Sequence, residues 1–94
     1  MKDQAVNEQS LNIVNEKVLH ARASARFVEV VEGFDARAEV EKDGMSVSGD
    51  SIMGLLMLGA SKGTAITVRT SGAQASALAD ALADLVRNRF GEDY

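Results

Sequence analysis

The sequence predicts an α+β fold in which one antiparallel sheet carries helices on one face. Along the 94-residue chain, segments with apolar residues at every second position alternate with segments whose apolar residues recur every three or four positions. Each strand and each helix therefore has a single apolar side, which requires two layers packed against each other. We expect one domain over residues 10–90, a flexible extension over 1–9 and a short tail over 91–94.

The first strand and the first helix are predicted on either side of residue 20. Leu11 and Ile13 alternate with polar neighbours, which predicts a strand over Ser10–Val14. A helix is predicted from Ala21, because Gly33 can end it and four apolar residues share one helical side: Ala23, Phe27, Val30 and Val31.

The next two strands form a predicted hairpin. Strict alternation of apolar and charged residues is typical of a half-buried strand over Phe34–Glu41. Asp43 and Gly44 then make a two-residue turn into a second strand over Met45–Ser48.

A short apolar segment over Ser51–Gly59 fits a helix or a strand by periodicity alone. Asp50 and Ser51 are favourable N-cap residues and Gly59 can end a helix, so we predict a helix. A fourth strand is predicted over Ala65–Thr70.

The final helix is predicted to begin with a capping box formed by Ser71 and Gln74. Its apolar side would consist of Leu78, Leu82, Leu85, Val86 and Phe90. A ferredoxin-like domain shares the first six elements of this order, so the pattern alone leaves the strand order open.

The composition excludes several function classes. The net charge is −4, the 10 basic residues are scattered and aromatic residues are 4%, which argues against a nucleic-acid partner. The chain has no cysteine, no segment with the roughly 20 apolar residues of a membrane span, and no signal-peptide pattern in Met1–Glu8. We therefore expect a cytoplasmic protein with no membrane, metal or cofactor partner, and without the acid-base pair of a conventional enzyme.

His20 is the only histidine, and it lies at the predicted junction of the first strand and first helix. A helix start exposes unpaired backbone N–H groups and the positive end of the helix dipole, so it can hold an anion attached to a side chain there. The imidazole, whose pKa is ordinarily about 6.5, is a neutral nucleophile near physiological pH. By position alone His20 is either a surface or capping residue or one that can carry a phosphoryl group, in which case Arg22 could pair with the phosphate oxygens.

Separate segments of the chain resemble the HPr family of phosphocarriers. The segment around His20 reads Leu-His-Ala-Arg, where the family usually has Gly-Leu-His-Ala-Arg-Pro-Ala. The matching segments are Leu19–Val28, Phe34–Ala36, Ser48–Leu55 and Lys62–Gly63. The resemblance implies an open-faced β-sandwich with strand order 1-4-2-3, phosphorylation of His20 on Nδ1 by enzyme I, and delivery to an enzyme IIA. It also implies that Arg22 assists the phosphoryl group.

The same resemblance makes Ser51 a candidate for regulatory phosphorylation by HPr kinase/phosphorylase. Its simpler role is to cap the short helix. Ile52, Met53 and Leu56 are either buried or form an exposed apolar patch on which a partner docks.

The chain departs from the family where Ala23 and Ser24 replace the usual Pro-Ala pair. An Ala-Ser pair is similar to HPr-like proteins of the nitrogen-related phosphotransferase branch, whose output is regulation. We expect a monomer that acts as a phosphoryl carrier rather than as a stand-alone enzyme. The alternative is a ferredoxin-like or HPr-like regulatory or interaction module without phosphotransfer.

Overall fold

The computed structural model describes residues 6–13, 21–59, 63–88 and 90. Strands and helices follow the predicted order along the chain. They are β1 (Val6–Asn12), α1 (Ala21–Glu32), β2 (Arg37–Lys42), β3 (Met45–Ser48), α2 (Ile52–Leu58), β4 (Ala65–Ser71) and α3 (Ala75–Arg87).

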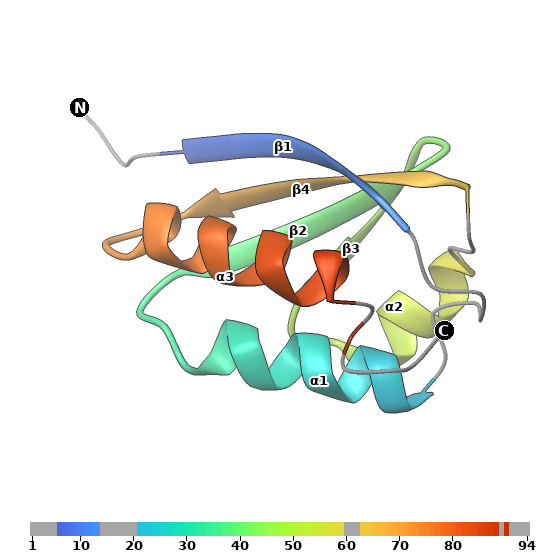
Figure 1. Ribbon diagram of the computed structural model, residues 1–94, viewed down its shortest axis with the longest axis horizontal. Helices are drawn as coiled ribbons and strands as arrows, with labels where there is room; N and C mark the ends of the chain where they lie inside the picture. Colours follow the sequence, from blue (N-terminus) through green and yellow to red (C-terminus); the bar gives the residue numbers. More distant parts are fainter. Residues whose placement is uncertain (1–5, 14–20, 60–62, 89, 91–94) are drawn as a thin grey trace.

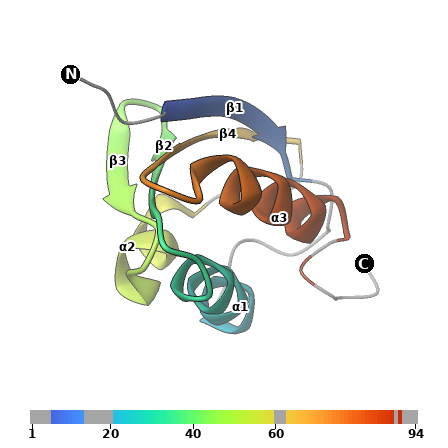
Figure 2. The ribbon, with the colours of Figure 1, turned by 90° about the vertical axis from the view of Figure 1, so that its left-hand side faces the viewer.

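The four strands form one sheet in the order β1-β4-β2-β3, and all three neighbouring pairs are antiparallel. Figures 1 and 2 show the three helices on one face of this sheet, which leaves the other face open. The predicted open-faced α+β sandwich is confirmed. A ferredoxin-like domain is excluded by the strand order, because its split βαβ arrangement places β1 inside the sheet, whereas β1 lies at the edge here. None of the helices in the described part of the chain is long and apolar enough to cross a membrane.

The core fills the space between the sheet and the helices. Alternate residues of β2 and β4 point into it, as the alternation predicted: Ala38, Val40, Ile66 and Val68. The helices contribute their apolar sides, of which the fully or nearly fully buried larger side chains are Phe27, Val31, Leu55, Leu78, Leu82 and Val86. Phe34 and Ala36 are partly buried against this core, although β2 itself begins only at Arg37.

The first strand was predicted too late in the chain, and residues 6–9 belong to the sheet rather than to a flexible extension. β1 pairs with β4 along its whole length. Its inward positions include two amides instead of apolar residues: Gln9 donates to the carbonyl of Ala79 at 2.8 Å, and Asn7 donates to the Ser76 hydroxyl at 3.2 Å. Hydrogen bonds to α3 thus replace the apolar alternation on which the prediction depended.

The predicted capping box at the start of the last helix is wrong. Ser71 is the last residue of β4, and Gln74 makes no side-chain cap. Instead Gln74 Oε1 accepts from the backbone N–H of Asp35 at 2.6 Å, while the Gln74 N–H donates to the Asp35 carbonyl. The helix also ends earlier than predicted, at Arg87, and Phe90 is buried beyond it with a positive φ of 56°.

Two local predictions in the middle of the chain are confirmed. Asp43 and Gly44 both have positive φ, at 52° and 82°, and join β2 to β3 as a two-residue hairpin turn. The short apolar segment is the helix α2, which Ser51 caps and Gly59 ends in the left-handed conformation.

Candidate functional site

Helix α1 begins at Ala21, as predicted, and its first turn carries no acidic residue. His20, with the rest of residues 14–20, lies outside the described residues. Arg22 is exposed in the first turn. In general the first N–H groups of a helix have no partners within the helix itself, and a helix start is a position at which proteins bind anions.

The charged side chains of α1 are placed unfavourably with respect to its helix dipole. Arg22 and Arg26 are exposed in its first half, and Glu29 and Glu32 are exposed in its second half. Negative charge at a helix start and positive charge at its end would stabilise the helix, typically by about 0.3–1 kcal/mol each. The observed order is the reverse, and it concentrates positive charge where the helix dipole is already positive.

The buried side of α1 contains one polar residue, Ser24. It is fully buried, and its hydroxyl has no hydrogen-bond partner in the structure described. Ala23, beside it, is also fully buried. The two residues in which the chain departs from the HPr pattern therefore pack into the core rather than face solvent.

Helix α2 lies beside α1, near the end of α1 where residue 21 is found (Figure 1). Two glycines allow this position. A Cβ on Gly49 would stand 2.8 Å from Ala38 Cβ, and a Cβ on Gly54 would stand 3.0 Å from Val47 Cβ. The absence of these side chains lets α2 pack closely on β2 and β3.

Ser51 is the N-cap of α2. Its hydroxyl accepts a hydrogen bond from the Gly54 N–H at 3.0 Å, and its backbone is extended, with φ −114° and ψ 109°. Its neighbour Asp50 accepts from the Ser48 hydroxyl at 2.5 Å. The capping role predicted for Ser51 is thus present in the structure.

The exposed side of α2 is apolar. Ile52, Met53 and Met57 are 40%, 69% and 68% exposed, whereas Leu55 and Leu58 fill the core from the opposite side. The helical face predicted for docking included Leu56, which is only partly exposed. The missed residue is Met57, which follows Met53 by four positions and therefore shares its face.

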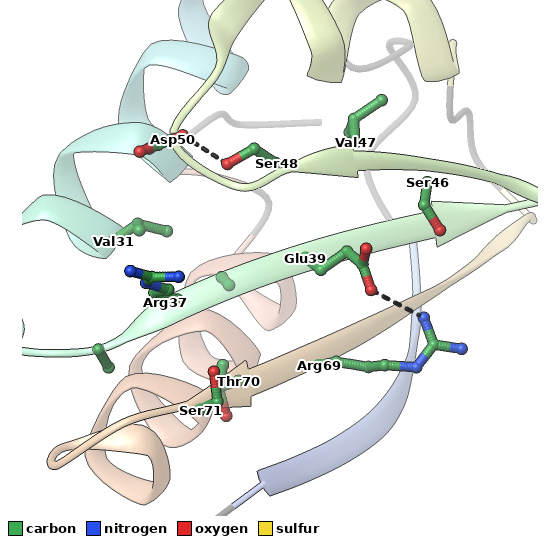
Figure 3. A pocket seen from close by; sticks show the side chains of 12 residues that line it. Val31, Arg37, Glu39, Ser46, Val47, Ser48, Asp50, Arg69, Thr70 and Ser71 are labelled. Atoms are coloured by element: carbon green, nitrogen blue, oxygen red, sulfur yellow. Dashed lines mark hydrogen bonds and ion pairs between the residues drawn. The ribbon is translucent and has the colours of Figure 1, made fainter. Parts of the chain in front are cut away.

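A shallow hollow of about 800 Å³ opens at the sheet, and Figure 3 shows the side chains that line it. Arg69 of β4 is one of the residues that line this hollow. Its guanidinium lies 2.6 Å from Glu41, 3.4 Å from Glu39 and 3.7 Å from Glu8. The hydrogen bond with Glu41, together with the negative charges of all three carboxylates, raises the pKa of Arg69 above its usual value. The network links β1, β4 and β2 across the uncovered face.

Among the predicted site residues that the structure describes, none lines this hollow. Arg22 lies on α1, and Ser51, Ile52, Met53 and Leu56 lie at α2, so the described members of the predicted site share the α1–α2 side of the molecule. An enclosed pocket serves a small substrate. A surface site of charged and apolar side chains fits a macromolecular partner better, and we place the candidate site there.

Comparisons with known proteins point to one family. A family model described as "PTS HPr component phosphorylation site" matches residues 7–88. "Phosphocarrier protein HPr" of Neisseria meningitidis is 45% identical over 85 residues, which cover 90% of this chain and 96% of that protein. "Phosphocarrier protein NPr" of Escherichia coli is 33% identical over 87 residues, covering 92% of this chain and 97% of that protein. The crystal structure of an HPr from Thermoanaerobacter tengcongensis matches with a TM-score of 0.87 at 36% identity, covering 94% of this chain and 99% of that chain.

Proposed function

Because the chain belongs to the HPr family of phosphocarriers of the phosphotransferase system, we propose that it accepts a phosphoryl group on His20 from enzyme I and passes it to an enzyme IIA. The observation that supports this most directly is the start of α1 at the next residue, Ala21. Family membership implies the two partner proteins. The residue that carries the group, and the residues that assist it, are our proposal.

The reversed charge order of α1 supports an anion at its start. Arg22 and Arg26 add positive charge to the positive end of the helix dipole, which is unfavourable for the helix alone. A phosphoryl dianion on the residue before the helix turns this repulsion into attraction. The charge order is thus better explained by binding an anion than by helix stability.

The transfer step is a displacement at phosphorus. The Nδ1 lone pair of His20 attacks the phosphorus atom while the bond from phosphorus to the donor group of enzyme I breaks. The first-turn N–H groups of α1 and the guanidinium of Arg22 stabilise the oxygens. In the second half-reaction an acceptor group of enzyme IIA attacks the same phosphorus, and the bond to Nδ1 breaks.

The exposed side of α2 provides the docking surface in this proposal. We define the docking patch as Ile52, Met53 and Met57, with Leu56 at its partly buried border. Helix α2 packs on α1 near the start of α1, so a partner that covers the patch also approaches that start. An apolar patch on a helix that packs against α1, whose first half carries the exposed Arg22 and Arg26, fits a partner surface with apolar and acidic residues.

The carrier is tested by incubation with phosphoenolpyruvate and enzyme I. We expect an acid-labile, alkali-stable phosphate on His20, and subsequent loss of the label when an enzyme IIA is added. The variant His20→Ala should take up no label while keeping the circular dichroism spectrum of the parent. Equal labelling of this variant would place the phosphate on another residue and contradict the assignment of His20, whereas no labelling of the parent would favour an HPr-shaped interaction module instead.

The branch of the phosphotransferase system is a second question for the same assay. The Ala23-Ser24 pair favours the nitrogen-related branch, whereas identity is higher to the N. meningitidis HPr than to the E. coli NPr. Sugar-type and nitrogen-type enzyme IIA proteins should therefore be offered in parallel, and the faster acceptor assigns the branch.

Regulation at Ser51 is supported by its position as the cap of α2, beside the docking patch. A phosphate there adds about −1.5 to −2 charges next to the surface that enzyme I would cover. HPr kinase/phosphorylase should label the parent and His20→Ala but not Ser51→Ala. Ser51→Asp should slow transfer from enzyme I, since it adds negative charge but keeps a residue that can cap the helix.

A further inference from the structure

All methionines of the described residues have exposed side chains. Met45, Met53 and Met57 are 43%, 69% and 68% exposed, and all three belong to β3 and α2, which pack against each other. No methionine is among the buried core residues of the described part, where Val, Leu, Ala, Ile and Phe do the packing. The chain also has no cysteine. Methionine is commonly used to fill irregular gaps in cores, so its placement only at the surface is unusual.

Met53 and Met57 are separated by one helical turn and share the face of α2 opposite Leu55 and Leu58. We propose that these two methionines are an oxidation-sensitive modification site, at which a peroxide converts the thioethers to sulfoxides and weakens docking of enzyme I. The inference rests on the proposed function of the docking patch. It adds to the docking patch an oxidation of its methionines, which docking itself does not require.

The reaction balances with a peroxide as the co-reactant. The thioether sulfur attacks the distal oxygen, an S=O bond forms, and the O–O bond breaks. Sulfur is oxidised by two electrons, and the peroxide is reduced to water or an alcohol. A methionine sulfoxide reductase with a thiol reductant reverses the change.

The sulfoxide acts on docking rather than on the fold. Both side chains are largely exposed and lie on the side of α2 opposite the buried Leu55 and Leu58, so oxygen added there meets solvent in the free protein. When a partner covers the patch, each S=O group must lose its water and find a new hydrogen bond. We expect roughly a tenfold or greater weakening of docking when both residues are oxidised.

The experiment treats the full chain with hydrogen peroxide and maps the sulfoxides by peptide mass spectrometry. Met53 and Met57 should oxidise faster than the less exposed Met45. Phosphotransfer from enzyme I is then measured over a range of carrier concentrations. We expect the KM for the carrier to rise about tenfold with little change in kcat, because the reacting atoms are untouched. Treatment with both methionine sulfoxide reductases, one for each epimer of the sulfoxide, should restore the original KM.

Two variants provide the controls. Met53→Leu with Met57→Leu keeps apolar side chains of similar volume, and its KM after peroxide should equal its own KM before peroxide. Met45→Leu should remain as sensitive to peroxide as the parent. An unchanged KM in the doubly oxidised parent, or an equal rise of KM in the double variant, would overturn the proposal.

Direct binding separates this inference from the proposed function. Enzyme I is titrated with His20→Ala, which cannot be phosphorylated there, before and after peroxide. Weaker binding after oxidation supports the modification site even if the parent takes up no phosphate on His20. Failure of phosphate uptake alone contradicts only the carrier proposal. Binding that peroxide leaves unchanged contradicts the modification site alone.

Discussion

The helices α1 and α3 lie against each other under the same sheet, yet they differ in where their charged residues stand and in whether a buried hydroxyl group has a partner. α3 has a basic residue in its last turn, and Arg87 pairs with Asp84 at 3.1 Å. α1 has its bases at the start and its acids at the end. The contrast extends to buried hydroxyls: Thr70, the last buried residue of β4, donates to Ala75 of α3 at 3.0 Å, whereas Ser24 of α1 has no partner among the described residues.

The difference teaches where the molecule is built for stability and where for function. Charge order, ion pairing and hydrogen bonding all favour α3 as a folded helix. The charge order and the buried hydroxyl of Ser24 depart from that optimum in α1, which begins beside the residue proposed to carry the phosphoryl group. Such local conflicts are expected at functional sites. Mutations in α3 should therefore change stability, and mutations at the start of α1 should change transfer.

The largest effect is expected from Leu82→Ala in α3. Leu82 is fully buried, so the variant loses apolar contacts and leaves a cavity. We expect a loss of about 2–5 kcal/mol in the free energy of unfolding, measured by urea denaturation. Phosphotransfer at a temperature where the variant is folded should stay near the parent rate. A large loss of transfer in the folded variant would remove the distinction between the helices.

Arg22→Ala should give the opposite result. Removing a charged hydrogen-bond donor to the phosphoryl oxygens is expected to lower kcat/KM for transfer about 10- to 100-fold, in line with about 1.5–3 kcal/mol for such a bond. The free energy of unfolding should change by less than about 0.5 kcal/mol, because Arg22 is exposed. Arg26→Ala, one turn further along, is the matched control and should have a smaller effect on transfer.

Ser24→Ala should stabilise the protein. The variant removes a buried hydroxyl that has no partner, and we expect a gain of about 1 kcal/mol in the free energy of unfolding. Thr70→Val removes a buried hydroxyl that does have a partner, and should cost about 1–3 kcal/mol. A loss of stability in both variants in urea denaturation would show that the hydroxyl of Ser24 is satisfied in solution.

The smallest effect concerns the end of α1. Glu32 is its last residue and is exposed. Glu32→Lys should raise the free energy of unfolding by about 0.3–1 kcal/mol at low salt, because it places positive charge at the negative end of the dipole. Arg87→Glu in α3 should lower it by a similar amount. Both effects should shrink when salt is added, as thermal denaturation at two ionic strengths will check.

Much of the fold was predictable because its signals are local. The alternation in β2 and β4, the Asp43-Gly44 turn and the glycine at the end of α2 each specify structure within a few residues. The start of β1 was missed because Asn7 and Gln9 occupy inward positions through hydrogen bonds to α3, about 70 residues away. Gln74 was misassigned for the same reason, since its partner Asp35 is distant in sequence.

The candidate site was predictable in part. Sequence pattern located Ser51 as a cap and Ile52 and Met53 as surface candidates, but it did not fix the helical phase that exposes Met57 more than Leu56. That phase depends on which side of α2 meets β3 and α1, a contact that periodicity within seven residues does not define. The strand order came from the family resemblance rather than from the pattern.

If partners dock on the proposed docking patch, its modest size limits how long each complex can last. Three side chains of a seven-residue helix supply its apolar part, whereas a stable protein interface uses roughly 20–30 residues a side. Differences in affinity between related complexes appear mainly in the dissociation rate, so we expect complexes that depend on this patch to be short-lived. A short residence time suits a protein that must leave one partner before it can meet the next.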